Sequence, residues 1–195
     1  MAKSHESVAL VGDETVKQFA TATLVAALTA AFAQIAVPYP FSPAEFTLQT
    51  MGVYLAGLLL GPAWGTFSLL LYVIAGVAGA PVFAGGSAGP GVIGGPTGGY
   101  VLSFPVAAGV IGALVHRRIQ PRQLDQVSVI LQTGALLAGL AVIYLVGSVW
   151  LGQSVSLTLP QAIVQGGVVF VPGDIAKAAV VMGLVTGGHL AAAQR

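Results

Sequence analysis

The sequence predicts an all-α, polytopic membrane protein with six transmembrane helices and a glycine-rich outer loop. Hydrophobic residues make up 56 % of its 195 residues and charged residues only 7 %, whereas soluble domains carry about 25 % charged residues. The apolar residues form six long segments separated by helix breakers, and the basic residues fall in alternate connections. A chain this apolar cannot cover its surface in water, so lipid is the expected solvent.

The apolar segments begin after a polar N-terminal stretch, residues 1–18, which we expect to be a short cytoplasmic segment. Residues 19–195 then form one six-helix transmembrane, substrate-binding domain, with no room for a separate soluble domain. The second segment is short, at most about 21 Å of helix, and a tight Gly61-Pro62 turn separates it from the third. The predicted spans are Phe19–Val37, Thr47–Leu60, Ala63–Ala80, Tyr100–Val115, Val127–Val149 and Val164–Ala192.

The connection Pro81–Gly99 is the most unusual part of the sequence because it is crowded with glycine and proline. That density of breakers predicts an irregular segment without a helix. The segment also contains Phe83 and other apolar residues, which indicates burial or a place at the wall of a cavity. Its backbone near Gly86, together with the side chains of Ser87, Thr97 and Tyr100, can hydrogen-bond a ligand.

Basic residues predict the orientation. Lys3 and Lys17 precede the first span, three arginines at positions 117, 118 and 122 lie between spans four and five, and Arg195 follows span six. With six spans, all of them fall on one side, which the positive-inside rule assigns to the cytoplasm. Both termini and the Arg117–Asp125 loop are therefore predicted to be cytoplasmic. The predicted outer loops are Pro38–Phe46, Pro81–Gly99 and Trp150–Gln161, and the expected location is the plasma (cytoplasmic) membrane.

Asp174 and Lys177 are the two ionisable residues that lie clearly within an apolar span. They stand three residues apart on one helix face, and a single charge at mid-membrane costs roughly 2.5–3.5 kcal/mol. Three interpretations stay open: a structural ion pair, a polar anchor for a ligand in an apolar cavity, and a proton-carrying role for Asp174. Pro172-Gly173 breaks the helix just before them and favours the ligand anchor, since it leaves backbone N–H groups free.

Other classes of chemistry lack the residues they need. The chain has no cysteine, no phosphate-binding loop, no Ser/His/Asp spacing and no cluster of metal ligands, and its net charge is +1. We therefore expect no enzymatic activity, no metal, no cofactor and no nucleic-acid partner. His116 is expected at a solvated helix end and His189 at the interface, while Glu45 is either an exposed charge or a rim residue of the site.

Several motifs resemble the BioY family, the biotin-binding S components of energy-coupling-factor (ECF) transporters. The resemblance spans roughly residues 22–190, and Glu45 departs from it where relatives more usually have a proline or an apolar residue. The matching stretches are Pro40-Phe41-Ser42-Pro43, Phe46-Thr47-Leu48-Gln49-Thr50, residues 52–62, Pro81-Val82-Phe83-Ala84-Gly85-Gly86, Gly95-Pro96-Thr97-Gly98-Gly99-Tyr100 and Pro172-Gly173-Asp174-Ile175-Ala176-Lys177.

The resemblance implies that biotin is held near the outer face by Asp174 and Lys177, with the Pro81–Tyr100 segment closing over it. Four aromatic residues are candidates either for packing on its rings or for a place in the bundle core or toward lipid: Trp64, Phe83, Phe104 and Phe170. The resemblance also implies partners, namely a transmembrane coupling subunit served by two ATPase subunits, or further copies of the chain in a homo-oligomer. The coupling subunit would dock on the small residues Ala22, Ala26 and Ala30, although such a face also suits packing within the bundle.

Three rival functions stay open on the sequence alone. The chain can be an S component for another vitamin, an autonomous secondary transporter that uses Asp174 as a proton carrier, or a membrane scaffold without a small-molecule ligand. Biotin binding by the purified protein distinguishes the first and third rivals. Uptake that collapses with the proton gradient distinguishes the second.

Overall fold

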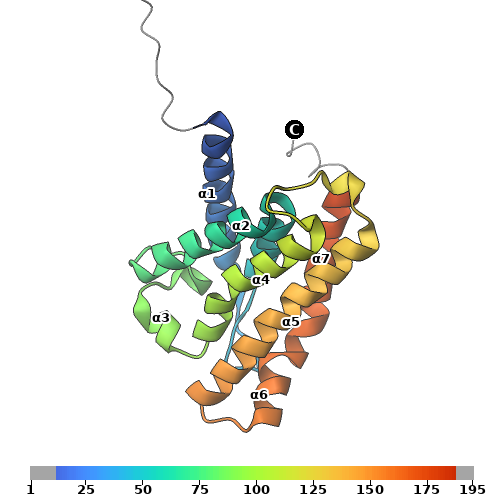
Figure 1. Cartoon of the computed structure of the whole chain (residues 1–195). Coiled ribbons are helices and arrows are strands. Elements are labelled where there is room, and N and C mark those ends of the chain that lie inside the picture. The colour runs from blue at the N-terminus through green and yellow to red at the C-terminus, as the bar shows by residue number, and fades with distance from the viewer. Residues whose placement is uncertain (1–11, 188–195) are drawn as a thin grey trace, which may run out of the picture.

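A computed structural model describes residues 12–187 and shows an α-helical bundle with one very small sheet (Figure 1). The α-helices are α1 Asp13–Ala33, α2 Gln49–Val77, α3 Pro90–Gly94, α4 Gly98–His116, α5 Val129–Ser154, α6 Leu159–Gly166 and α7 Val171–Thr186. Three short 3₁₀ helices, η1 Ala84–Gly86, η2 Leu124–Gln126 and η3 Val168–Phe170, and the strands β1 Ala36–Val37 and β2 Phe46–Thr47 complete the fold.

Five helical segments within residues 12–187 are long and apolar enough to cross a membrane: α1, α2, α4, α5 and Leu159–Thr186. Large apolar side chains lie exposed along them, for example Ile130 at 86 % and Leu145 at 69 %. Such exposure is unfavourable in water and suits hydrocarbon. The prediction of an all-α polytopic membrane protein is thus confirmed.

The predicted six separate helices are corrected to five membrane-length helical segments within the described part of the chain, because the second and third predicted helices are joined in α2, which folds back on itself. The chain reverses at Gly61, whose φ of +72° is the one non-helical conformation inside α2. After the reversal, Gly65 lies against the Ala56 carbonyl, where a Cβ would come within 2.7 Å of the oxygen. Gln49 and Tyr72, near opposite ends of α2, are joined by a hydrogen bond. Because the reversal at Gly61-Pro62 uses only one non-helical residue, the two halves of α2 follow each other without a loop between them.

Helix α4 lies between α2 and α5 and is the centre of the bundle. Glycines allow this close packing: a Cβ on Gly57 of α2, or on Gly139 of α5, would overlap the side chain of Ile111. Ile111 itself is fully buried. Small residues at the contacts let helix backbones approach closely, which is how helices associate in lipid.

The connections hold more regular structure than predicted. Strands β1 and β2 pair antiparallel across the connection between α1 and α2, where no strand is expected from the sequence. The Pro81–Gly99 connection contains η1 and the five-residue α3, since Pro90 suits the first turn of a helix. The predicted Trp150–Gln161 loop shortens to residues 155–158 because α5 extends to Ser154 and α6 begins at Leu159.

The bounds of the first and last spans also differ from the prediction. Helix α1 already begins at Asp13, inside the predicted N-terminal segment, and the last span is broken at Gly167, which separates α6 from η3 and α7. Because residue 167 is a glycine, its backbone adopts a non-helical conformation at little cost. The predicted end of the last span at Ala192 lies outside the described residues, as does His189.

The prediction that His116 lies at a solvated helix end is wrong, since this side chain is fully buried. Its Nε2 lies 2.9 Å from the Leu58 carbonyl oxygen, and its Nδ1 accepts the backbone N–H of Arg122 at 2.9 Å. These two bonds assign a neutral ring that donates through Nε2. His116 thereby joins the end of α4 and the following loop to α2 beside the Gly61 turn.

Candidate functional site

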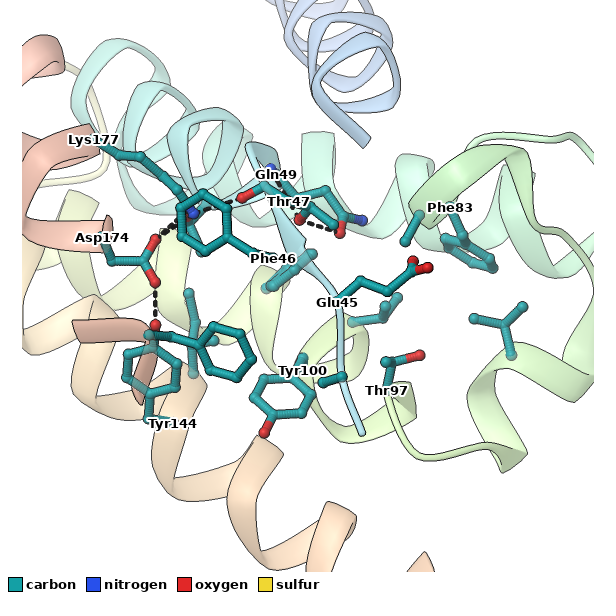
Figure 2. A pocket seen from close by; sticks show the side chains of 18 residues that line it. Glu45, Phe46, Thr47, Gln49, Phe83, Thr97, Tyr100, Tyr144, Asp174 and Lys177 are labelled. Carbon is teal, nitrogen blue, oxygen red and sulfur yellow. Dashed lines mark hydrogen bonds and ion pairs between the residues drawn. The ribbon is translucent and has the colours of Figure 1, made fainter. Parts of the chain in front are cut away.

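A cavity of about 70 Å³ lies among the first turns of α2, α4 and α7, the middle of α5, β2 and the glycine-rich connection. Figure 2 shows its lining side chains. The lining residues are Ala44, Glu45, Phe46, Thr47, Gln49, Thr50, Phe83, Ala84, Val92, Thr97, Tyr100, Val101, Phe104, Ile143, Tyr144, Phe170, Asp174 and Lys177. Most of them are apolar or aromatic, so the few polar groups have a low-dielectric surrounding.

Asp174 is 2 % exposed and lies in the first turn of α7. One carboxylate oxygen, Oδ1, accepts the Thr50 hydroxyl at 2.6 Å and the Lys177 ammonium at 2.7 Å. The other, Oδ2, accepts the hydroxyl of Tyr144 (Figure 2). Donors from three helices therefore stabilise the ionised carboxylate at the edge of the cavity.

Lys177 lies one turn further along α7 and is 6 % exposed. Besides Asp174, its ammonium donates to the Thr47 carbonyl oxygen at 2.5 Å and to Thr50 Oγ1 at 3.2 Å. It also lies 3.8 Å from the centroid of the Phe46 ring, a cation–π contact. The pair is therefore electrically neutral and hydrogen-bonded, as a buried pair has to be.

A glycine on α7 makes room for the Phe46 ring that contacts Lys177. A Cβ on Gly173 would overlap this ring, so glycine at this position allows Phe46 to lie against the start of α7. The Pro172-Gly173 sequence thus shapes the cavity wall as well as the beginning of the helix. The sequence predicts a helix break and free backbone N–H groups at this dipeptide, but not its contact with Phe46.

Gln49 provides a second polar group on the cavity wall, at the beginning of α2. Its Oε1 accepts the Thr47 hydroxyl at 2.8 Å, and its Nε2 donates to the Tyr72 hydroxyl at 2.5 Å. The Tyr72 hydroxyl donates its one proton to the Val82 carbonyl oxygen, so the Gln49 atom that faces it is the donating nitrogen. In Figure 2, Gln49 and Thr47 lie between the Asp174–Lys177 pair and the opposite wall with Glu45, Thr97 and Phe83.

Aromatic rings form much of the remaining wall. Tyr144 and Phe170 are stacked with their centroids 6.4 Å apart. The Tyr100 hydroxyl donates to the Gly166 carbonyl oxygen at 2.7 Å, which ties α4 to α6. A flat apolar ligand body would lie among these rings and Phe104, with its polar groups toward Asp174 and Lys177.

The structure brings five of the seven predicted binding residues to this cavity: Phe83, Thr97, Tyr100, Asp174 and Lys177. The other two, Gly86 and Ser87, do not line it. Ser87 lines an outer groove next to Thr97, and its hydroxyl donates to the Ala84 carbonyl; Gly86 lies near the side chain of Gln34. Their role in binding remains a prediction.

Two further predicted residues have a clear position. Glu45 is exposed and lines both the cavity and the outer groove, which makes it a rim residue. Trp64 lies elsewhere, in a groove beside Lys17 and Arg122. Of the aromatic residues proposed to pack on a ligand, Phe83, Phe104 and Phe170 do line the cavity.

Sequence reasoning missed Gln49, Thr50 and Tyr144 as site residues. Gln49 and Thr50 belong to the Phe46–Thr50 motif, where polar residues directly precede a long apolar helix, and this position was the available signal. Tyr144 is the one tyrosine in the predicted span Val127–Val149. Neither signal shows that the side chains of Thr50 and Tyr144 reach Asp174 on another helix.

The alanines predicted to dock a partner pack largely within the chain. Ala22 is fully buried and Ala26 is 7 % exposed, while Ala30 is partly buried. Ser68 of α2 donates its hydroxyl to the Ala22 carbonyl oxygen at 2.7 Å, so this face of α1 lies directly on α2. Docking of another subunit through these alanines remains a prediction.

The arrangement is suited to binding a small molecule with an apolar body and a few polar groups. Among residues 12–187, no three His, Asp or Glu side chains gather as metal ligands. Within the same residues, the site combines two carboxylates (Asp174 and the rim residue Glu45), one ammonium and one amide with aromatic walls. Fold and site together define a polytopic membrane protein with a ligand cavity between its helices.

The chain belongs to the BioY family, which it matches over residues 3–194. It is 41 % identical over 163 residues to a protein of Pyrococcus horikoshii named probable biotin transporter BioY, covering 84 % of this chain and 90 % of that protein. It is 36 % identical over 161 residues to the biotin transporter BioY of Thermotoga maritima, covering 83 % and 89 %. A crystal structure of the S-component for biotin from an ECF-type ABC transporter has a TM-score of 0.80 and 27 % identity, with coverages of 91 % and 93 %.

Proposed function

We propose that this chain binds biotin in the Asp174–Lys177 cavity and mediates its uptake as the S component of an ECF transporter. The observation that carries the proposal is the neutral, hydrogen-bonded ion pair at the edge of an otherwise mostly apolar cavity. Support comes from relatives named biotin transporters and from the similar S-component structure. A role in binding and transport requires no catalytic residue.

The chemistry of biotin matches the groups around the cavity. Biotin has an apolar bicyclic body, a ureido group with two N–H donors and one C=O acceptor, and one carboxylate. Asp174 is placed to accept ureido N–H groups, and Lys177 to bind the carboxylate or the ureido oxygen. The aromatic wall suits the bicyclic body, because few convergent polar groups in an apolar pocket give both affinity and orientation.

We further propose that the cavity opens to the outside of the cytoplasmic membrane and that both termini are cytoplasmic. Lys17 and Arg122 lie together in one groove beside Leu60, next to the α2 reversal. In Figure 1 the beginning of α1 and the α4–α5 connection lie toward one side of the molecule, while α3 and α6 lie toward the other. The clustering of basic residues on the first side supports its assignment to the cytoplasm.

Docking of a coupling subunit with two ATPase subunits completes the proposal. On α1, Leu24 is 68 % exposed and Leu28 is 37 % exposed, whereas Ala22 and Ala26 face α2. We therefore place the contact with the coupling subunit along the exposed side of α1. The alanines Ala22, Ala26 and Ala30 support it indirectly, since they hold α1 close to α2.

The geometry disfavours a proton-carrying role for Asp174. A carrier has to bind and release a proton during each cycle, but this carboxylate accepts bonds from an ammonium and two hydroxyls. Protonation would remove the charge partner of a buried Lys177, which is unfavourable in a low-dielectric surrounding.

Titration of the purified protein with labelled biotin tests the proposed function. We expect binding at sub-micromolar concentrations that is much weaker in Asp174→Asn and Lys177→Ala. If both variants keep the affinity of the parent protein, the ion pair is structural and the proposal is wrong. If the parent protein itself does not bind biotin below micromolar concentrations, an S component for another ligand becomes the better explanation.

A further inference from the structure

Tyr72 connects the cavity to the glycine-rich segment without lining the cavity itself. The ring lies in the second half of α2 and is 2 % exposed. Its hydroxyl accepts the Gln49 amide at 2.5 Å and donates to the Val82 carbonyl oxygen at 2.9 Å. A phenolic hydroxyl has one proton to donate, and Tyr72 donates it to the backbone of the glycine-rich segment at Val82.

The hydrogen bonds around Tyr72 run in one direction. The Thr47 hydroxyl donates to Gln49, Gln49 donates to Tyr72, and Tyr72 donates to the backbone of Val82. Each donor in such a chain strengthens the next bond. The Lys177 ammonium donates to the main-chain carbonyl of the same residue, Thr47, so the residue at which the chain of bonds begins also contacts the ion pair.

Packing reinforces the contact between Tyr72 and the segment. The Phe83 ring is fully buried and meets the Tyr72 ring edge-on, with centroids 5.5 Å apart and planes at 81°. Phe83 also lies against Gly76, where a Cβ would overlap its ring. Phe83 lines the cavity as well, so Tyr72 holds a cavity residue by its ring and the neighbouring backbone by its hydroxyl.

The cavity has to widen to admit a ligand. Its volume of about 70 Å³ is far below the roughly 300–1,000 Å³ of typical ligand pockets. Most of the wall consists of long helices, whereas residues 82–97 contain only η1 and α3 and have positive φ at Gly85, Gly86 and Gly89. Residues 82–97, like residues 44–47, are therefore a part of the wall that does not belong to a long helix.

We propose that Tyr72 is a positioning residue that couples ligand binding at Gln49 to the position of residues 82–97. Two other side chains bond to this connection: Gln34 to the Pro81 carbonyl at 3.3 Å and Trp150 to the Gly95 carbonyl at 3.0 Å. Neither of them lines the cavity. Tyr72 differs from them because its hydrogen-bond partner Gln49 lines the cavity. A ligand that engages the Gln49 amide therefore changes the bond between Tyr72 and Val82.

The proposal rests on biotin being the ligand, and its test uses the fact that the chain contains no cysteine. Ala88 is exposed in the outer groove, so Ala88→Cys provides a single reporter for maleimide labelling of the segment. We expect saturating biotin to slow labelling several-fold in this reporter protein. Adding Tyr72→Phe removes only the hydroxyl, keeps the ring contact with Phe83, and should abolish this effect.

Biotin dissociation provides the second readout. Tyr72→Phe removes the bond to the Val82 carbonyl and the acceptor of the Gln49 amide, so we expect roughly tenfold faster dissociation with a smaller change in the association rate. Gln34→Ala is the matched control, because it also removes a side-chain bond to this connection. It should retain the slowing of labelling by biotin.

Each result decides between defined alternatives. Unchanged biotin dependence of labelling and unchanged dissociation in Tyr72→Phe would overturn the role of Tyr72, as would equal loss in Gln34→Ala. If Tyr72→Phe does not fold, Gln49→Ala tests the same coupling at saturating biotin, and retained slowing would overturn it. Failure of the parent protein to bind biotin would instead refute the proposed function.

Discussion

Replacing Lys177 by methionine removes the charge partner of Asp174 and keeps a long, apolar side chain in its place. The carboxylate then retains the hydroxyls of Thr50 and Tyr144 but loses the ammonium at 2.7 Å. Removing one partner of a buried pair destabilises a protein by about 3–5 kcal/mol. Because two donors remain, we expect the lower end of this range, about 3 kcal/mol.

Asp174→Asn breaks the pair from the other side and leaves the Lys177 ammonium with the Thr47 carbonyl, the Thr50 hydroxyl and the Phe46 ring. The double variant Asp174→Asn/Lys177→Met contains no unpaired buried charge, so it should be more stable than either single variant. In a protein of this size, 1 kcal/mol shifts the melting temperature by about 2–4 °C. Each single variant should therefore melt roughly 6–12 °C below the parent protein.

Thermal unfolding of detergent-purified protein, followed by intrinsic fluorescence, measures this order of stability, and biotin titration measures affinity in parallel. All three variants should bind biotin at least tenfold more weakly, including the double variant with restored stability. The combination separates a ligand-binding pair from a structural one. A double variant that melts below both single variants, or any of the three with parental affinity, would refute the reasoning.

Three further predictions concern other positions. Gly173→Ala should weaken biotin binding about tenfold because its Cβ would overlap the Phe46 ring, whereas Gly183→Ala, with nothing within 4 Å of its Cβ, should bind like the parent in the same titration. Glu45→Gln removes a negative charge from the cavity rim. By an order-of-magnitude electrostatic argument, it should speed the association of anionic biotin about two- to fivefold at low salt. An unchanged stopped-flow association rate, or a gain that persists at high salt, would contradict this prediction. His116→Ala loses two hydrogen bonds in a buried site and should lower stability by about 2–4 kcal/mol with little change in affinity, which thermal unfolding and titration together can verify or refute.

The charged half of the site was predictable from the sequence, while the uncharged half was not. Asp174 and Lys177 stand out because charges in an apolar span are unfavourable unless a function or a partner explains them. Thr50 and Tyr144 are small or amphipathic residues that any transmembrane helix tolerates, so nothing marks them. They lie 124 and 30 positions from Asp174 along the chain, and only the packing of the helices brings them together.

The fold shows the same division between local and tertiary information. The reversal at Gly61-Pro62 is a local signal and was predicted. The number of separate helices depends on how many non-helical residues the turn contains, and here it contains one. His116, next to two arginines, has the sequence context of a solvated helix end. Its burial follows from the α2 carbonyl of Leu58, which lies within hydrogen-bond reach only after α2 and α4 have packed.

An experimental structure of the protein with bound biotin tests the central claim most directly. The account predicts biotin in the cavity between α2, α4, α5 and α7, with a polar group within hydrogen-bond distance of Asp174 or Lys177 and its bicyclic body against the aromatic wall. Biotin bound elsewhere, or in this cavity with both residues still engaged only with Thr47, Thr50 and Tyr144, would contradict it.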